Sequence, residues 1–246
     1  MVFFWDVVAL AFQALTFFYI GKIVDPDALP EFGGAQVSYL EFVVVGIAVS
    51  GFVALALVRA ASAFRQEQLT GTLEMLFMTP TTQTTIQLGL VFYDLIYMPL
   101  RTAVFFLIIV VAFDVQLDST GILPATVTLL AFIPFVWGFG IVLSAATITF
   151  KKGGTALLAS LLTLTSGAFF PITLFPTWLM TLAELNPMTI AITTMRETLL
   201  GGAGWSAVGD ALVVLVPAAA LTLLLGVACF RSAVRRERRR GTVGLY

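Results

Sequence analysis

Few residues of this sequence could do chemistry, because it has no histidine and a single cysteine, Cys229. Without imidazole there is no Ser-His triad or histidine metal ligand, and one thiol excludes an internal disulfide and a thiolate metal cluster. Asp6, Asp94 and Arg101 are the charged residues that we expect inside apolar stretches. Intramembrane hydrolysis needs a convergent set of His, Asp or Glu, so a membrane enzyme is disfavoured. We therefore predict no catalytic residue, no metal site and no cofactor bound by this chain.

Asp94 and Arg101 are the pair with the most informative spacing. Seven residues apart, they share one face of an expected membrane helix, with Arg101 roughly 10 Å deeper. An arginine at depth costs at least about 2.5 kcal/mol to insert, so it should be paired or hydrated, and its side chain leans back toward Asp94. Pro99 also frees the carbonyl of Leu95 in this stretch. Two interpretations stay open: a structural pair that braces the helix, or a polar point on a substrate path or subunit seam.

The composition requires a membrane to position these residues. Of 246 residues, 59% are hydrophobic and 11% charged, and the mean hydropathy is +1.02, so one globule could not cover its surface with polar groups. A spanning helix needs about 20 apolar residues. We predict an all-α polytopic membrane protein, one transmembrane domain over residues 1–246, with six spans at about 2–24, 40–60, 90–113, 121–149, 155–175 and 209–230.

The basic residues give the orientation, because Lys and Arg in short loops stay on the cytoplasmic side. With both termini inside, ten of the thirteen basic residues lie on the inner face: Arg59, Arg65, Lys151, Lys152, Arg231, Arg235, Arg236, Arg238, Arg239 and Arg240. Lys22 and Arg196 would lie on the outer face, which is otherwise acidic. The sequence thus predicts a multi-pass protein of the plasma membrane with cytoplasmic termini.

The cytoplasmic segment 62–86 should contain a short amphipathic helix between Arg65 and Thr79. At 100° per residue its leucines share one face, and Glu67, Gly71 and Glu74 share the other. Pro80 ends this helix. Such a helix could simply cover lipid, but carboxylates are an unusual choice at a membrane surface, where Lys and Arg are favoured. The alternative is a docking surface for a cytosolic partner.

The sequence from residue 153 to residue 183 is uncharged, too long for one simple span, and interrupted by Pro171 and Pro176. We expect a buried helix over Thr155 to Phe170, followed by an outer re-entrant segment over 171–200. Trp178 would be an interfacial aromatic, and Arg196 would be external. This segment could be an outer plug that shapes a dimer, an exit gate for an amphiphile, or both.

Two blocks of residues carry a family resemblance. The first resembles the loop signature of ABC type-2 exporter permeases, and its residues are Arg65, Glu67, Gly71, Thr72, Leu73, Glu74, Leu76, Thr79 and Pro80. The second is similar to that family's broken fifth helix, outer hairpin and return to the sixth span, and its residues are Ser166, Gly167, Phe170, Pro171, Pro176, Trp178, Leu179, Asn186, Pro187 and Arg196. The resemblance covers nearly the whole chain in order.

The resemblance implies a half-transporter. A separate ABC ATP-binding subunit would dock on Arg65, Glu67, Gly71, Thr72, Glu74, Thr79 and Pro80, and the outer gate would comprise Phe170, Pro171, Pro176, Trp178, Asn186 and Pro187. A second copy or a related permease would complete the path, and no nucleic acid partner is expected. The sequence has no GxxxxGK[ST] phosphate loop, so ATP and Mg would bind the partner subunit. The implied substrate is an amphipathic small molecule, lipid or lipid-linked glycan. The alternative is an uncoupled channel or a structural membrane scaffold.

Overall fold

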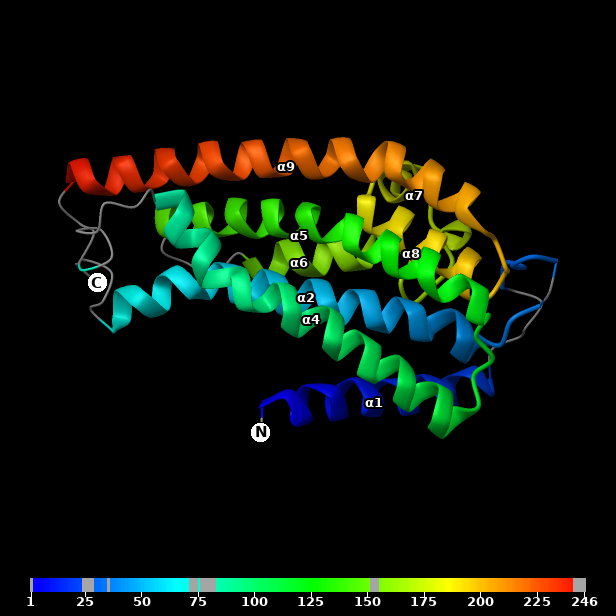
Figure 1. Cartoon of the computed structure of the whole chain (residues 1–246). Coiled ribbons are helices and arrows are strands. Elements are labelled where there is room, and N and C mark those ends of the chain that lie inside the picture. The colour runs from blue at the N-terminus through cyan, green and yellow to red at the C-terminus, as the bar shows by residue number, and fades with distance from the viewer. Residues whose placement is uncertain are drawn as a thin grey trace. The chain divides into compact units, whose positions relative to one another are not determined.

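The structure is a computed structural model, and it describes residues 2–23, 29–34, 36–70, 75, 83–150 and 155–240. No strand occurs among these residues, so the predicted all-helical class is confirmed. The main helices are α1 (Val2–Gly21), α2 (Tyr39–Leu69), α4 (Gln83–Phe113), α5 (Ile122–Phe150), α6 (Thr155–Leu164), α7 (Thr177–Glu184), α8 (Pro187–Leu199) and α9 (Trp205–Arg240) (Figure 1). Two short 3-10 helices are η2 (Ser119–Gly121) and η3 (Ile172–Leu174).

The chain divides into two compact units. The first unit comprises Met1–Phe52, Pro99–Phe132 and Leu161–Val216, and the second comprises Val53–Met98, Ile133–Ser160 and Pro217–Tyr246. Three long helices pass from one unit to the other at or beside a proline: Pro99 in α4, Pro134 in α5 and Pro217 in α9. Because proline lacks an N–H, each of these helices loses one backbone hydrogen bond where it changes unit.

Three helices of the described residues are long and apolar enough to cross a membrane: Tyr39–Arg59, Ser119–Ala146 and Trp205–Arg236. Two shorter apolar helices are Val8–Gly21 and Tyr97–Phe113. The multi-pass character of the chain follows from these helices, and the count of six spans stays a prediction.

Two predicted helix boundaries differ from the structure. The second span was expected to end near residue 60, but α2 continues to Leu69 and includes the backbone of Arg65 and Glu67. The fifth helix was expected to reach Phe170, but α6 ends at Leu164. Beyond it, Ser166 Oγ donates to the carbonyl of Thr163 at 2.6 Å, and Gly167 has φ +67°. A left-handed glycine cannot continue an α-helix, which accounts for the earlier end.

The core of the first unit surrounds the N-terminal half of α2. Phe42, Val43 and Ile47 are buried there, together with Phe105 and Ile109 of α4. Leu10 and Ala14 of α1 complete this cluster. Lipid tails are as apolar as these side chains, so close van der Waals packing rather than water exclusion holds such helices together.

In the second unit, glycines bring α5 and α9 into backbone contact. A Cβ atom added at Gly138 would lie 2.5 Å from the backbone nitrogen of Leu223, and one at Gly226 would lie 2.7 Å from the carbonyl oxygen of Gly138. Thr222 Oγ1 also donates to the carbonyl of Phe135 at 3.4 Å. Small residues at a helix crossing are typical of membrane proteins, and here they fix α9 against α5.

Candidate functional site

The site with the most specific geometry is built around Arg196, near the end of α8. The register of α8 is set at its start, where the side chain of Asn186 accepts a hydrogen bond from the backbone N–H of Met188 and Pro187 occupies the first helical turn. This is an ordinary N-cap, with proline where its missing N–H does no harm. Asn186 Nδ2 also donates to the carbonyl of Leu162 and to Thr165 Oγ1, each at 2.9 Å. The start of α8 is therefore tied to the end of α6.

Arg196 is buried, with 4% of its surface exposed, and its guanidinium donates to three backbone carbonyls. Nε donates to Phe42 at 2.9 Å, one terminal nitrogen to Gly167 at 3.0 Å, and the other to Ala168 at 2.8 Å. The guanidinium carbon lies 3.5 Å from the centroid of the Phe42 ring. Planar arginine suits such a fork of acceptors and an aromatic face. One side chain thus joins α8, α2 and the turn that follows α6.

Two glycines make this arrangement possible. The left-handed turn at Gly167 places two successive carbonyls within reach of Arg196. Gly46 of α2 leaves room for the turn, because a Cβ atom there would collide with the carbonyl oxygen of Ala168. Tyr39 adds a hydrogen bond from its hydroxyl to the carbonyl of Phe169 at 3.2 Å. The turn is therefore held between α2 and α8.

The structure corrects the expected exposure of Arg196, because the side chain is buried inside the protein rather than open to water. Its position on the outer side of the membrane stays a prediction. Burial lowers the pKa of Arg196 to about 9, which the nearby Tyr39 partly offsets, and a pKa of that size keeps the guanidinium charged at neutral pH. Among the described residues, carbonyl dipoles rather than a carboxylate compensate this charge. Counting charges assumes that an arginine between spans faces water, and it cannot anticipate acceptors from distant segments.

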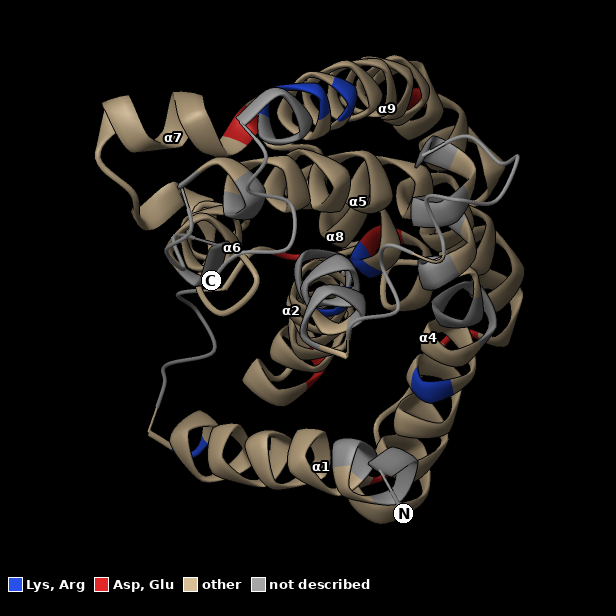
Figure 2. Ribbon diagram, turned by 90° about the vertical axis from the view of Figure 1, so that its left-hand side faces the viewer, with Lys and Arg blue, Asp and Glu red and all other residues tan. Residues whose placement is uncertain are grey.

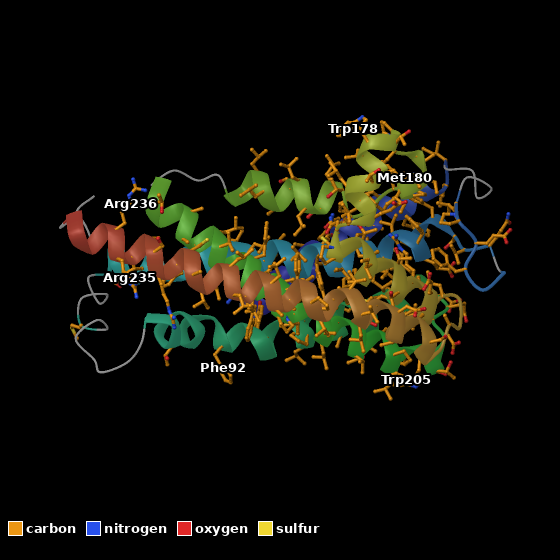
Figure 3. The ribbon with its side chains drawn as sticks, turned by 90° about the horizontal axis from the view of Figure 1, so that it is seen from above. Phe92, Trp178, Met180, Trp205, Arg235 and Arg236 are labelled. Atoms are coloured by element: carbon orange, nitrogen blue, oxygen red, sulfur yellow. The ribbon has the colours of Figure 1, made fainter. Side chains whose placement is uncertain are left out.

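The predicted gate residues separate into two groups. Asn186 and Pro171 are buried, whereas Phe170 and Trp178 are 52% and 68% exposed, and Pro176 is exposed. Pro187 is partly buried. Trp178 projects outward from α7 (Figure 3). Leu174, Leu182 and Leu185 are also exposed around it. The outer segment thus has a polar anchor at Asn186 and an exposed apolar surface, defined by Phe170, Leu174, Trp178, Leu182 and Leu185.

Arg101, the predicted intramembrane cation, is 6% exposed and lies in the first unit. One of its terminal nitrogens donates to the carbonyl of Gly51 at 3.2 Å, which links α4 to α2. Asp94 lies in the same helix, but its side chain is outside the described residues. The pairing of the two charges stays a prediction.

The comparison with known families decides the class of this protein. Residues 3–200 match the profile of the family described as ABC-2 type transporter. The chain belongs to the ABC-2 type transporter family. A search of curated proteins gave no match. The resemblance inferred from the two sequence blocks is thereby confirmed.

As an ABC-2 permease, the chain is a membrane transport subunit of an ABC transporter, and its family works with an ATP-binding subunit. The predicted docking residues of this permease lie mostly outside the described residues: Gly71, Thr72, Glu74, Thr79 and Pro80. The side chains of Arg65 and Glu67 also lie outside them, although α2 carries both.

Sequence reasoning missed the main architectural residues of this ABC-2 permease. Gly46 and Tyr39 gave no signal, because a glycine and a tyrosine in an apolar helix are ordinary. Arg196 did give one, since it closes the second family block that also contains Gly167 and Asn186. All three take part in hydrogen bonds between α8 and the segment around the end of α6: Asn186 donates to Leu162 and Thr165, and Arg196 donates to Gly167. Their order along the chain suggested an association but not its geometry.

Proposed function

We propose that this permease is the membrane subunit of an ATP-driven ABC exporter for an amphipathic substrate, such as a drug-like molecule, a lipid or a lipid-linked glycan. The carrying observation is the family match over residues 3–200, because it contains both the segment 62–86 and the outer segment 171–200. The chain would act in the plasma membrane with cytoplasmic termini, beside a second copy or a related permease. ATP and Mg would bind the partner subunit.

The outer segment is proposed as the exit gate for the substrate. Its exposed apolar surface over η3 and α7 offers contacts to hydrocarbon parts of an amphiphile, while Asn186 and Arg196 hold its base against α6 and α2. A gate needs a mobile surface on a fixed support, and this division of exposed and buried residues supports the assignment. Asp94 and Arg101 are proposed to contribute a polar point along the substrate path.

The coupling proposal places the ATP-binding subunit on segment 62–86, and charge reversal tests it. We expect Glu67→Lys with Glu74→Lys to insert normally but to lose the ATP-binding subunit in a pull-down and to lose stimulation of its ATPase, because complementary charge governs such docking. Glu31→Lys with Glu184→Lys is the matched control, since both residues are exposed carboxylates of the predicted outer face. Normal ATPase stimulation by the Glu67/Glu74 variant would remove segment 62–86 from coupling, and transport without any ATP-binding subunit would favour the channel alternative.

A further inference from the structure

Helix α9 combines a long apolar surface with a basic C-terminal end. In the candidate span Trp205–Arg236, 17% of the most apolar window is buried, against 72% of the corresponding window in the candidate span Tyr39–Arg59 of α2. The uncharged run Ala211 to Phe230 is 20 residues long, about 30 Å of helix, which matches the hydrocarbon core of a bilayer. Arg231 follows this run directly. The helix therefore reaches the headgroup layer where its arginines begin.

The apolar residues and the arginines share one face of α9. Leu221, Leu224 and Leu225 are exposed, and so are Arg231, Arg235 and Arg236 farther along. The opposite face is closed, because Phe230, Ala233 and Val234 are buried against Ile141 and Ala145 of α5. At 100° per residue the two sets of exposed side chains fall on the same half of the helix. A lipid whose tails cover the leucines would therefore have its headgroup beside the arginines.

We propose that Arg231, Arg235 and Arg236 form a binding site for the phosphate headgroups of anionic phospholipids. Arg231 and Arg236 are about 7.5 Å apart along the helix axis, which equals the depth of one headgroup layer, about 5–7.5 Å. Arginine binds phosphate through a planar fork of donors. Blue ribbon marks this basic end of α9 in Figure 2, and Figure 3 shows Arg235 and Arg236 projecting from it.

A lipid fits these observations better than a cytosolic protein does. The arginines continue the face whose apolar part is exposed over a bilayer's thickness, and they begin where the uncharged run ends. A cytosolic partner on this face would have to lie within the headgroup layer. A protein partner is therefore an outcome that the experiment must distinguish.

Cys229, the single cysteine, is exposed two positions before Arg231 and provides a site for a donor dye. The purified full chain is labelled there and reconstituted in phosphatidylcholine vesicles that contain a trace of acceptor-labelled phosphatidylglycerol or acceptor-labelled phosphatidylcholine. We expect higher energy transfer to phosphatidylglycerol, reduced by salt. Each Arg→Gln change should lower this preference about five-fold, and Arg231→Gln, Arg235→Gln and Arg236→Gln together should abolish it.

The matched control is Arg238→Gln, Arg239→Gln and Arg240→Gln, which removes the same charge from the last three residues of the same helix. We expect it to keep most of the preference, and a triple Arg→Lys variant at 231, 235 and 236 should keep part of it. Equal transfer to both lipids by the unchanged protein overturns the proposal, as do equal losses in the two Gln triples, which would indicate net charge alone. If the Gln triple at 231, 235 and 236 keeps its lipid preference but no longer retains the ATP-binding subunit in a pull-down, the arginines form a protein site and the proposal is wrong.

Discussion

Arg196 Nε donates a hydrogen bond of 2.9 Å to the backbone carbonyl of Phe42, and the same guanidinium stacks at 3.5 Å over the Phe42 ring. One residue of α2 therefore receives both the polar edge and the planar face of one arginine. The remaining donors reach Gly167 and Ala168, so the turn after α6 is fixed through the same group. A cation inside apolar packing is costly unless hydrogen bonds replace its water, and here three carbonyls do so.

The first prediction concerns replacement of this arginine. Arg196→Met should lower the free energy of unfolding by several kcal/mol, because three buried carbonyls lose a charged donor, each worth about 1.5–3 kcal/mol. Arg196→Lys should rescue only a small part, since a lysine cannot reproduce the fork. Thermal unfolding in detergent measures the effect, with exposed Arg235→Lys as the control. A melting temperature of Arg196→Met equal to that of the unchanged protein would show that the carbonyls find other donors.

The second prediction tests the close approach at Gly46. Gly46→Ala should destabilise the protein by about 1–3 kcal/mol, because its methyl group would collide with the carbonyl of Ala168. Gly209→Ala is the control, since Gly209 also lies in a helix but has no atom within 4 Å of an added Cβ. The control should be neutral or stabilising by up to about 1 kcal/mol. Equal effects of the two changes on thermal unfolding would contradict the tight contact.

The third prediction compares the loss of Arg101 with the loss of Asp94, the two charges expected inside the membrane. Arg101→Ala removes one charged hydrogen bond to Gly51, about 1.5–3 kcal/mol, so the protein should fold while transport falls to background. Under the predicted pairing, Asp94→Ala removes the carboxylate partner of a buried arginine and should cost about 3–5 kcal/mol, so this variant should accumulate poorly in membranes. Membrane levels and vesicle transport measure the two effects. Full transport by a stable Arg101→Ala protein would leave the arginine with a structural role alone.

The fourth prediction concerns pH and Glu197 of α8. Burial, with the nearby charge of Asp210, raises the pKa of Glu197 above its ordinary value. Because the folded state holds this proton more tightly, its stabilising contribution is complete below the unperturbed glutamate pKa of about 4.3 and is lost as pH rises through the folded pKa. Glu197→Gln should therefore melt at a higher temperature than the unchanged protein at neutral pH, and the difference should shrink in acid. The exposed Glu184→Gln serves as control, and a constant difference across pH would exclude titration of Glu197 as the cause.

Local sequence patterns predicted much of this fold, because the long apolar runs of α2, α5 and α9 match the length and polarity of a bilayer's hydrocarbon core. The end of α6 was harder to predict from the sequence. The segment Thr155 to Phe170 is uniformly uncharged, and the left-handed conformation of Gly167, which stops the helix, leaves no mark in that pattern. The candidate site was the hardest part to predict from the sequence. Arg196 lies 154 residues from Phe42 and 28 from Ala168, and no local period encodes contacts over such separations. Residue spacing identified several of the residues involved, whereas only the structure shows which of them are hydrogen-bonded to one another.

The order of the Arg196 contacts along the chain also matters during synthesis. A ribosome that adds about 5–20 residues per second makes Phe42 roughly 8–30 s before Arg196, which lies 154 positions later, and it makes Gly167 and Ala168 in between. The acceptors therefore leave the ribosome before the cation does. A nascent chain that stalls upstream of Arg196 would expose these carbonyls without their hydrogen-bond donor, a feature that cellular quality control could recognise. In a completed chain, all three acceptors are already present when Arg196 is added.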